Sequence, residues 1–321
     1  MGSRKYRLGA FYTLLAAVLI IIAVAVGWKL ADKNYYNKLN AYPLLDPSVS
    51  QANVHQEVIN FDPLRQNLKA YLGSLNLSHS FYFEYLSNGA NIRDGADNAS
   101  FAASLLKVPV VMDLYRLSEL GKLNPNQQVT VQQSDINNDA DYGNPTNLQP
   151  GNTLTLGQAA KITLQDSDNT TLAVIKDKVV PLLTDSTDSV QSLDISFSLV
   201  DTSPGNEEAT ISARSYASIL KCLYYACFNT PQDSTQMLNY LTGSAEHNRL
   251  MAGVPSSLQV AHKVGSSSTS QSDCGIIYLP GKPYLVCLMF FDMTPATGNV
   301  DPYFQHVSQM IYKYVNSSGN N

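Results

Sequence analysis

Charged side chains are scarce in this sequence. Only 15% of its 321 residues are Asp, Glu, Lys or Arg, and the net charge is −5. No run of Lys and Arg forms the basic stripe with which proteins neutralise phosphates, so we expect no nucleic-acid partner. Hydrophobic residues make up 44% of the chain, which is enough for at least one large globular core.

Histidine and cysteine are also few. The five His residues are scattered and suggest neither a catalytic triad nor a metal site, and the four Cys residues lack zinc-ligand spacing. We therefore predict no metal and no cofactor. Cys222 and Cys227 are five positions apart on a predicted helix, which does not place them on one face. Cys274 and Cys287 fall nearly opposite each other on two predicted strands and could form a bridge, although we favour two small buried thiols.

One long apolar run lies near the N-terminus. It extends from Leu8 to Trp28 and is long enough to cross a bilayer as a helix. Basic residues precede it, no small-residue cleavage site follows it, and no Cys lies near it. The run therefore favours an uncleaved signal anchor with a cytoplasmic N-terminus. We expect residues 1–7 in the cytoplasm, 8–28 in the membrane and 29–55 as a tether outside it.

The remainder, residues 56–316, is predicted to be one α+β domain with a polar tail at 317–321. Predicted strands are 80–86, 90–93, 258–266, 274–279 and 284–293. Predicted helices are 61–72, 104–120, 156–164, 170–180, 212–227, 234–241 and one that starts at Asp301. A sheet built from both ends of the domain, with the helical middle as a second lobe, leaves a cleft between them.

Three short strings could carry acyl-transfer chemistry. The first is Ser104-Leu-Leu-Lys107, at the start of a predicted helix, where this spacing puts hydroxyl and amine on one face. A serine hydroxyl needs a base to take its proton, and a lysine in an apolar segment can supply one when burial lowers its pKa. A capping serine with a solvent-facing lysine is the alternative for an isolated pair.

The other two strings add polar groups from distant parts of the chain. Ser167-Asp168-Asn169 precedes a helix, where Ser167 could pass a proton to a leaving group and Asn169 could hold Lys107 and substrate. Lys263-Val264-Gly265 lies on a predicted strand, where Lys263 could bind a substrate carboxylate and polarise Ser167. Gly265 would admit the substrate backbone, and the N–H of Ser266 could donate to an oxyanion. His262 should point to the opposite face of that strand from Lys263.

Together the three strings resemble the motif set of the class A β-lactamase-like serine hydrolases, which include penicillin-binding proteins. This resemblance covers roughly residues 61–315 and implies a five-stranded antiparallel sheet flanked by the terminal helices, with an all-helical lobe. It implies Ser104 as the acylated nucleophile, Lys107 as its base, Ser167 and Asn169 as the second motif, and Lys263 and Gly265 as the third. The oxyanion hole would be the N–H groups of Ser104 and Ser266.

Two departures from that family pattern bear on the substrate. Val264 stands where the family commonly has a hydroxyl residue, and Ser266, Ser267 or Ser268 could substitute for it. No Glu-x-x-Leu-Asn follows Ser167, so the base that activates the deacylating water in class A β-lactamases is missing. The stretch from residue 185 to residue 208 instead holds these acidic residues: Asp185, Asp188, Asp194, Asp201, Glu207 and Glu208.

Three interpretations follow from the motifs and their departures. The chain is expected to act on a β-lactam or a cell-wall D-alanyl amide, with inefficient β-lactam turnover. The alternatives are a D,D-peptidase-type penicillin-binding enzyme and a catalytically weak domain that binds peptidoglycan.

Overall fold

The computed structural model describes residues 26–27, 29, 42–46, 59–136, 145–193 and 209–318. Most of the predicted anchor, Leu8 to Trp28, lies outside these residues. Among the helices that are described, none is both long enough and apolar enough to cross a bilayer.

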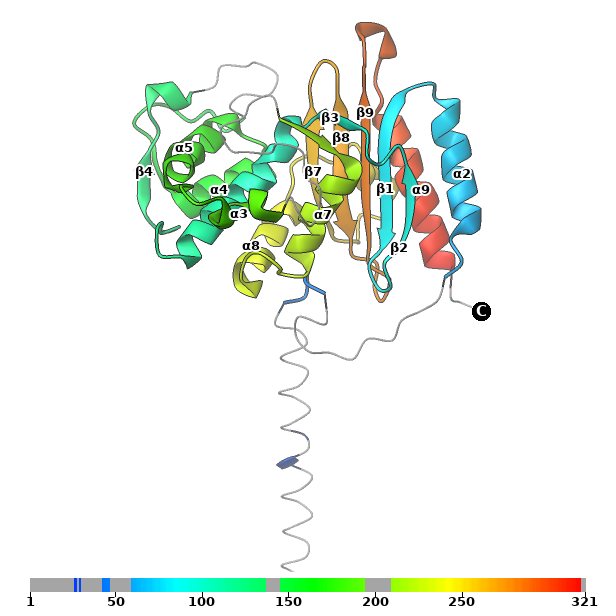
Figure 1. Ribbon diagram of the computed structural model, residues 1–321, viewed down its shortest axis with the longest axis horizontal. Helices are drawn as coiled ribbons and strands as arrows, with labels where there is room; N and C mark the ends of the chain where they lie inside the picture. Colours follow the sequence, from blue (N-terminus) through cyan, green and yellow to red (C-terminus); the bar gives the residue numbers. More distant parts are fainter. Residues whose placement is uncertain are drawn as a thin grey trace, which may run out of the picture.

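A five-stranded antiparallel sheet forms the centre of the domain (Figure 1), as expected from the sequence. In the order β2-β1-β9-β8-β7, its strands are Ala90–Asp94, Ser78–Tyr85, Tyr284–Phe291, Gln271–Ile277 and Val260–Ser266. Strands β1 and β9 pair along their whole length, from Ser78 with Phe291 to Tyr85 with Tyr284. The first and last parts of the domain are therefore joined in one sheet, and β7 lies at the edge next to the helical lobe (Figure 1).

Each face of the sheet packs on helices through alternate residues of its strands. Helices α2 (Asp62–Ser74) and α9 (Asp301–Ser317) pack with Phe81 and Phe83 of β1 in one core. Helix α7 (Ala213–Tyr224) packs with Tyr82 in the other core, which continues into the lobe. The lobe contains α3 (Lys107–Glu119), α4 (Leu156–Gln165), α5 (Asn169–Val179) and α8 (Pro231–Thr242).

Short elements complete the described part of the chain. Two-stranded sheets pair β3 (Ala99–Phe101) with β6 (Thr210–Ser212) and β4 (Gln128–Thr130) with β5 (Thr153–Thr155). The 3-10 turns are Ala103–Leu106, Gln133–Asp135, Val180–Leu182, Ser186–Asp188, Val190–Leu193, Leu250–Gly253 and Pro295–Thr297. The sequence did not predict the small strands, because three residues are too few to show a period of two.

The structure joins Cys222 to Cys227 and Cys274 to Cys287. The favoured pair of free thiols at 274 and 287 was therefore wrong, and the bridge left open there is present. Helix α7 ends at Tyr224 rather than at residue 227, and Ala226 adopts a left-handed φ of 50°. This turn brings the N–H of Cys227 to 2.9 Å from the carbonyl of Cys222 and the two Cα atoms to 5.0 Å. Cys274 and Cys287 are direct partners in the β8–β9 ladder.

Candidate active site

Ser104 lies on a tight turn between the β3 strand and α3. The turn η2 (Ala103–Leu106) is a 3-10 helix, so the expected α-helix begins at Lys107 rather than at Ser104. Ala103 has a φ of 47°, a left-handed conformation that is uncommon for any residue with a side chain other than Asn or Asp. The serine is partly exposed at this turn, while Leu105 beside it is buried. The turn therefore leaves Ser104 partly exposed, while Leu105 fixes the turn to the hydrophobic core.

Lys107 does not face solvent. It is 1% exposed, and its amino group lies 2.7 Å from Ser104 Oγ and 2.6 Å from Asn169 Oδ1. Ser167 Oγ is a third partner at 3.4 Å. Three side-chain oxygens from two elements thus surround one buried amine, and a capping serine with a solvent-facing lysine does not describe this pair.

In Ser167-Asp168-Asn169, hydrogen bonds of the middle residue fix the position of the string. Asp168 is fully buried and caps helix α5, accepting a hydrogen bond from the backbone N–H of Thr171 at 2.7 Å. Its other oxygen accepts from Thr146 Oγ1 at 2.7 Å. Ser167 has a left-handed φ of 56°. This local geometry places the side chains of Ser167 and Asn169, on either side of the cap, against Lys107.

Lys263 approaches the same serine from the sheet. Its amino group lies 2.9 Å from Ser167 Oγ and 3.1 Å from the carbonyl of Val264, and the residue is 1% exposed. The pKa of Lys263 is lowered to about 8, mainly by burial and also by the nearby Arg249 charge, while Glu246 and Asp273 oppose the shift. Ser167 is therefore a hydroxyl between two buried amines, one from the lobe and one from the sheet.

Gly265 lies in close contact with other parts of the protein, which leave no space for a side chain. A Cβ at this position would lie 2.5 Å from Ser272 Oγ, 3.0 Å from the carbonyl of Ala102 and 3.2 Å from Leu105 Cγ. The missing side chain thus lets β7 pack directly against the η2 turn that carries Ser104. This contact, which the sequence did not predict, sets the distance between Ser104 and the end of β7.

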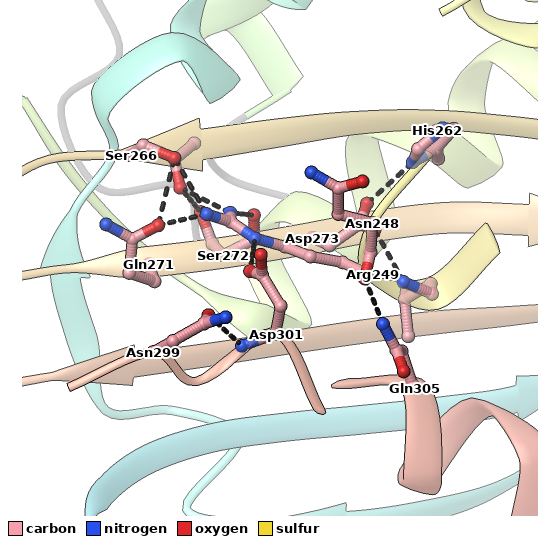
Figure 2. A network of polar contacts seen from close by, with 12 residues as sticks. Asn248, Arg249, His262, Ser266, Gln271, Ser272, Asp273, Asn299, Asp301 and Gln305 are labelled. Carbon is pink, nitrogen blue, oxygen red and sulfur yellow. Dashed lines mark hydrogen bonds and ion pairs between the residues drawn. The ribbon is translucent and has the colours of Figure 1, made fainter. Parts of the chain in front are cut away.

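Arg249 is a buried cation at this site that the sequence did not reveal (Figure 2). Its guanidinium donates to the carbonyl of Gly265 at 3.0 Å, to that of Ser272 at 2.7 Å and to Ser266 Oγ at 2.9 Å. It also bonds Gln271 Oε1 and, at 2.9 Å, Asp301 of α9. Nothing in the sequence around position 249 signals this role, because all five partners come from other segments.

The Ser266 hydroxyl is part of this arginine network. It also donates to Gln271 Oε1 at 3.0 Å (Figure 2). Arg249 consequently links the end of β7 to β8 and α9, and its positive charge lies 2.9 Å from the Ser266 hydroxyl.

His262 lies on the other face of β7 from Lys263, as strand alternation predicts. Its Nδ1 is 2.9 Å from Asp273 Oδ1, and both residues are fully buried (Figure 2). The other Asp273 oxygen accepts from the N–H of Leu250, next to Arg249. We interpret the pair as a support for β7 and not as a part of the reacting group.

A buried carboxyl holds the segment after α5 against α3. Asp113 accepts hydrogen bonds from the N–H of Val190 at 2.6 Å and from Ser189 Oγ at 3.0 Å, and burial raises its pKa to about 7. Asp188 pairs with Lys122. Four of the acidic residues from the sequence lie outside the described residues: Asp194, Asp201, Glu207 and Glu208. Within the described part, no three His, Cys, Asp or Glu residues gather as a metal site would require.

The family model described as "Beta-lactamase enzyme family" matches residues 63–315. No curated protein matches the chain.

Solved structures with the same fold include PBP-A and a β-lactamase from Sphaerobacter thermophilus. A PBP-A mutant, described as an acyl-enzyme complex with penicillin G, has 20% identity and a TM-score of 0.67, covering 79% of this chain and 96% of its own. The Sphaerobacter thermophilus enzyme has 19% identity and a TM-score of 0.67, covering 80% and 98%. At such identities these structures establish the fold alone.

Proposed function

This chain belongs to the beta-lactamase enzyme family and is a serine hydrolase acting on amide bonds, and we propose that Ser104 attacks a β-lactam or a related cell-wall D-alanyl amide. The observation that carries this proposal is the distance of 2.7 Å between Ser104 Oγ and the buried amine of Lys107. A lysine that is withdrawn from water and hydrogen-bonded to a hydroxyl is suited to act as its base.

Acylation begins with Lys107 in its amine form. Ser104 Oγ bonds to the carbonyl carbon of the substrate while its proton passes to Lys107 Nζ. The negative charge moves to the carbonyl oxygen, which the backbone N–H groups of Ser104 and Ser266 stabilise. Asn169, whose side-chain oxygen is 2.6 Å from Lys107, holds the resulting ammonium.

Collapse of the intermediate breaks the bond to nitrogen, and the leaving amine needs a proton. Ser167 donates its hydroxyl proton to that nitrogen and regains one from Lys107, 3.4 Å away, while Lys263 stays protonated at 2.9 Å from the same hydroxyl. The proton taken from Ser104 thus ends on the leaving group, and an ester to Ser104 remains. Water completes the hydrolysis.

Hydrolysis of this ester is proposed to be slow, because the sequence lacks the family's deacylating glutamate motif. A D,D-peptidase-type penicillin-binding activity fits this feature, and the PBP-A mutant described as an acyl-enzyme complex with penicillin G supports it by analogy. A catalytically weak peptidoglycan-binding domain is the second candidate, favoured by Val264 at the hydroxyl position. The paired serines and buried lysines favour the enzyme.

The test is to incubate the full-length chain with a fluorescent penicillin and to follow its intact mass. We expect one covalent adduct that persists for hours, and none with Ser104→Ala. Ser87→Ala, which removes a serine hydroxyl from the turn between β1 and β2, should label like the wild type. Wild-type protein that forms no adduct with penicillins or acyl-peptide esters would contradict the enzyme proposal, and rapid turnover of a chromogenic cephalosporin would contradict slow deacylation.

A membrane-anchored, extracytoplasmic placement is part of the proposal and rests on the apolar run from Leu8 to Trp28. The full-length chain should sediment with membranes and resist extraction by high salt. Protease added outside intact cells should remove the domain. Recovery of the full-length chain in the soluble fraction would contradict this placement.

A further inference from the structure

A second cavity opens at the end of the sheet away from Ser266. It has a volume of about 590 Å³ and is bounded by the end of α7, the β8–β9 hairpin and the segment 42–46 below α7 (Figure 1). Gln259, just before β7, lines it, whereas Ser266 ends that strand. At about 3.3 Å per residue, some 20 Å of strand separate the two ends, so the cavity is distinct from the acylation site.

Three tyrosines are among the residues that line the cavity. The rings of Tyr224 and Tyr225 meet edge to face at 5.3 Å, and those of Tyr224 and Tyr278 are 6.5 Å apart. The hydroxyl of Tyr225 donates to the carbonyl of Leu86 at 3.3 Å, and that of Tyr278 donates to the carbonyl of Leu44 at 2.8 Å. These two hydroxyl protons are used within the protein, so Tyr225 and Tyr278 offer a ligand their rings and hydroxyl oxygens, and Ser87 and Gln259 are the uncharged polar side chains of the lining.

Asp46 is the one charged residue among the described residues that line the cavity. Its backbone N–H donates to the carbonyl of Tyr224 at 2.8 Å, which fixes the segment beside the rings. The carboxylate contributes to raised pKa values of Tyr224 and Tyr225, after the larger effect of burial. It therefore lies close enough to both rings for its charge to act within the same space.

We infer that this cavity binds a quaternary ammonium group. Aromatic rings attract cations through their negative faces, and the Asp46 carboxylate adds a full opposite charge. Primary ammonium groups are strongly hydrated and need hydrogen-bond acceptors to replace that water. A trimethylammonium group needs none, so it suits a wall of tyrosine rings and prolines such as Pro43 and Pro280.

The test compares choline with 3,3-dimethyl-1-butanol, its neutral isostere, by calorimetry on the full-length chain in a detergent without ammonium groups. We expect choline to bind about tenfold more tightly, because the two ligands differ only in charge. Asp46→Asn and Tyr225→Leu should each weaken choline binding severalfold. Asp62→Asn, which removes a carboxylate from the exposed start of α2, should not.

Acylation by penicillin provides the check on folding, since neither Asp46 nor Tyr225 belongs to the acylation site. Both variants should be acylated at the wild-type rate. Equal binding of the isostere and choline, no binding of either, or unchanged choline binding by Asp46→Asn would overturn the inference. Glycerophosphocholine distinguishes the source: binding as tight as that of choline indicates a lipid headgroup, and weaker binding indicates a free cation.

Discussion

The most unusual residues of this protein are its two buried lysines. Lys107 and Lys263 are each 1% exposed and reach Ser167 from opposite sides. Burial disfavours the charged form of an amine, so each lysine depends on the hydroxyl and carbonyl oxygens around it. In the proposed mechanism the two similar side chains have different tasks: Lys107 takes the proton of Ser104, and Lys263 keeps a positive charge near the substrate.

Acylation should slow as the pH rises through about 8. Lys263, whose pKa burial lowers to about 8, is protonated below that pH and loses its charge above it. Lys263→Arg keeps the charge, because a guanidinium does not titrate in this range, so its rate should not fall between pH 8 and 10. The measurement is the rate of penicillin labelling from pH 6 to 10, with the surface variant Lys69→Arg as control. A fall at the same pH in Lys263→Arg would assign it to another group.

The raised pKa of Asp113 predicts that the stability of the fold depends on pH. Burial raises its pKa in the folded protein from 3.8 to about 7, so the folded state holds this proton more tightly than the unfolded chain. That contribution to stability is complete below pH 4 and is lost as the pH rises through 7. Asp113→Asn stays neutral and should be more stable than the wild type at pH 8, by up to a few kcal/mol, and similar at pH 4. Thermal unfolding at both pH values measures this. An equal difference at both would contradict it.

Among the elements, β7 connects the site to the rest of the sheet. Lys263 faces Ser167, Gly265 packs on the turn that carries Ser104, and Ser266 is tied to Arg249. An edge strand normally has only one neighbouring strand to hold it. Here the η2 turn and the buried arginine supply further contacts, which explains how an edge strand can hold the buried amine of Lys263 in place.

The Cys274–Cys287 disulfide joins β8, the strand next to β7, to β9. Cys274 pairs with both Lys263 on β7 and Cys287 on β9. Replacing both cysteines with Ala should cost about 3 kcal/mol of unfolding free energy, because the closed loop spans a separation of 13 residues. Loss of Cys222–Cys227, with a separation of 5, should cost less. Urea unfolding of the two double variants compares them, and a larger loss at the shorter loop would contradict this account.

At the scale of the whole molecule, the proposed acylation site and the tyrosine-lined cavity lie at opposite ends of the sheet. The segment 42–46 contributes only to the second end, where Leu44 and Leu45 are 2% and 4% exposed. The acylation site is composed of residues beyond position 59. Activity and the N-terminal segment should therefore be separable.

A chain that begins at Gln56 should be acylated by penicillin within about twofold of the wild-type rate. It should also unfold at lower temperature, since losing two buried leucines costs on the order of 3 kcal/mol. A chain that begins at Asn40 keeps both leucines and should retain the wild-type melting temperature. Labelling kinetics and thermal unfolding of the two chains test the domain boundary, and loss of labelling only in the shorter chain would place the boundary earlier.

Much of the fold and of the candidate site could be predicted from the sequence. Strand alternation and helical periodicity are local, so the sheet strands and the main helices could be found within a few residues of their observed limits. The motif residues could be named because each string is short and its chemistry depends on residue type. The ends of helices were less certain, as at Tyr224, where a left-handed residue stops the helix and allows a disulfide.

The sequence by itself thus determined which side chains were available for acyl transfer and which elements carry them. Only the tertiary structure decided how they meet: Ser167 between two amines, Gly265 against Ala102, Arg249 behind Ser266 and Asp113 beneath Val190. Each of these contacts joins segments that are distant in the chain. Burial and hydrogen bonding arise from such packing, and no local pattern of residues encodes them.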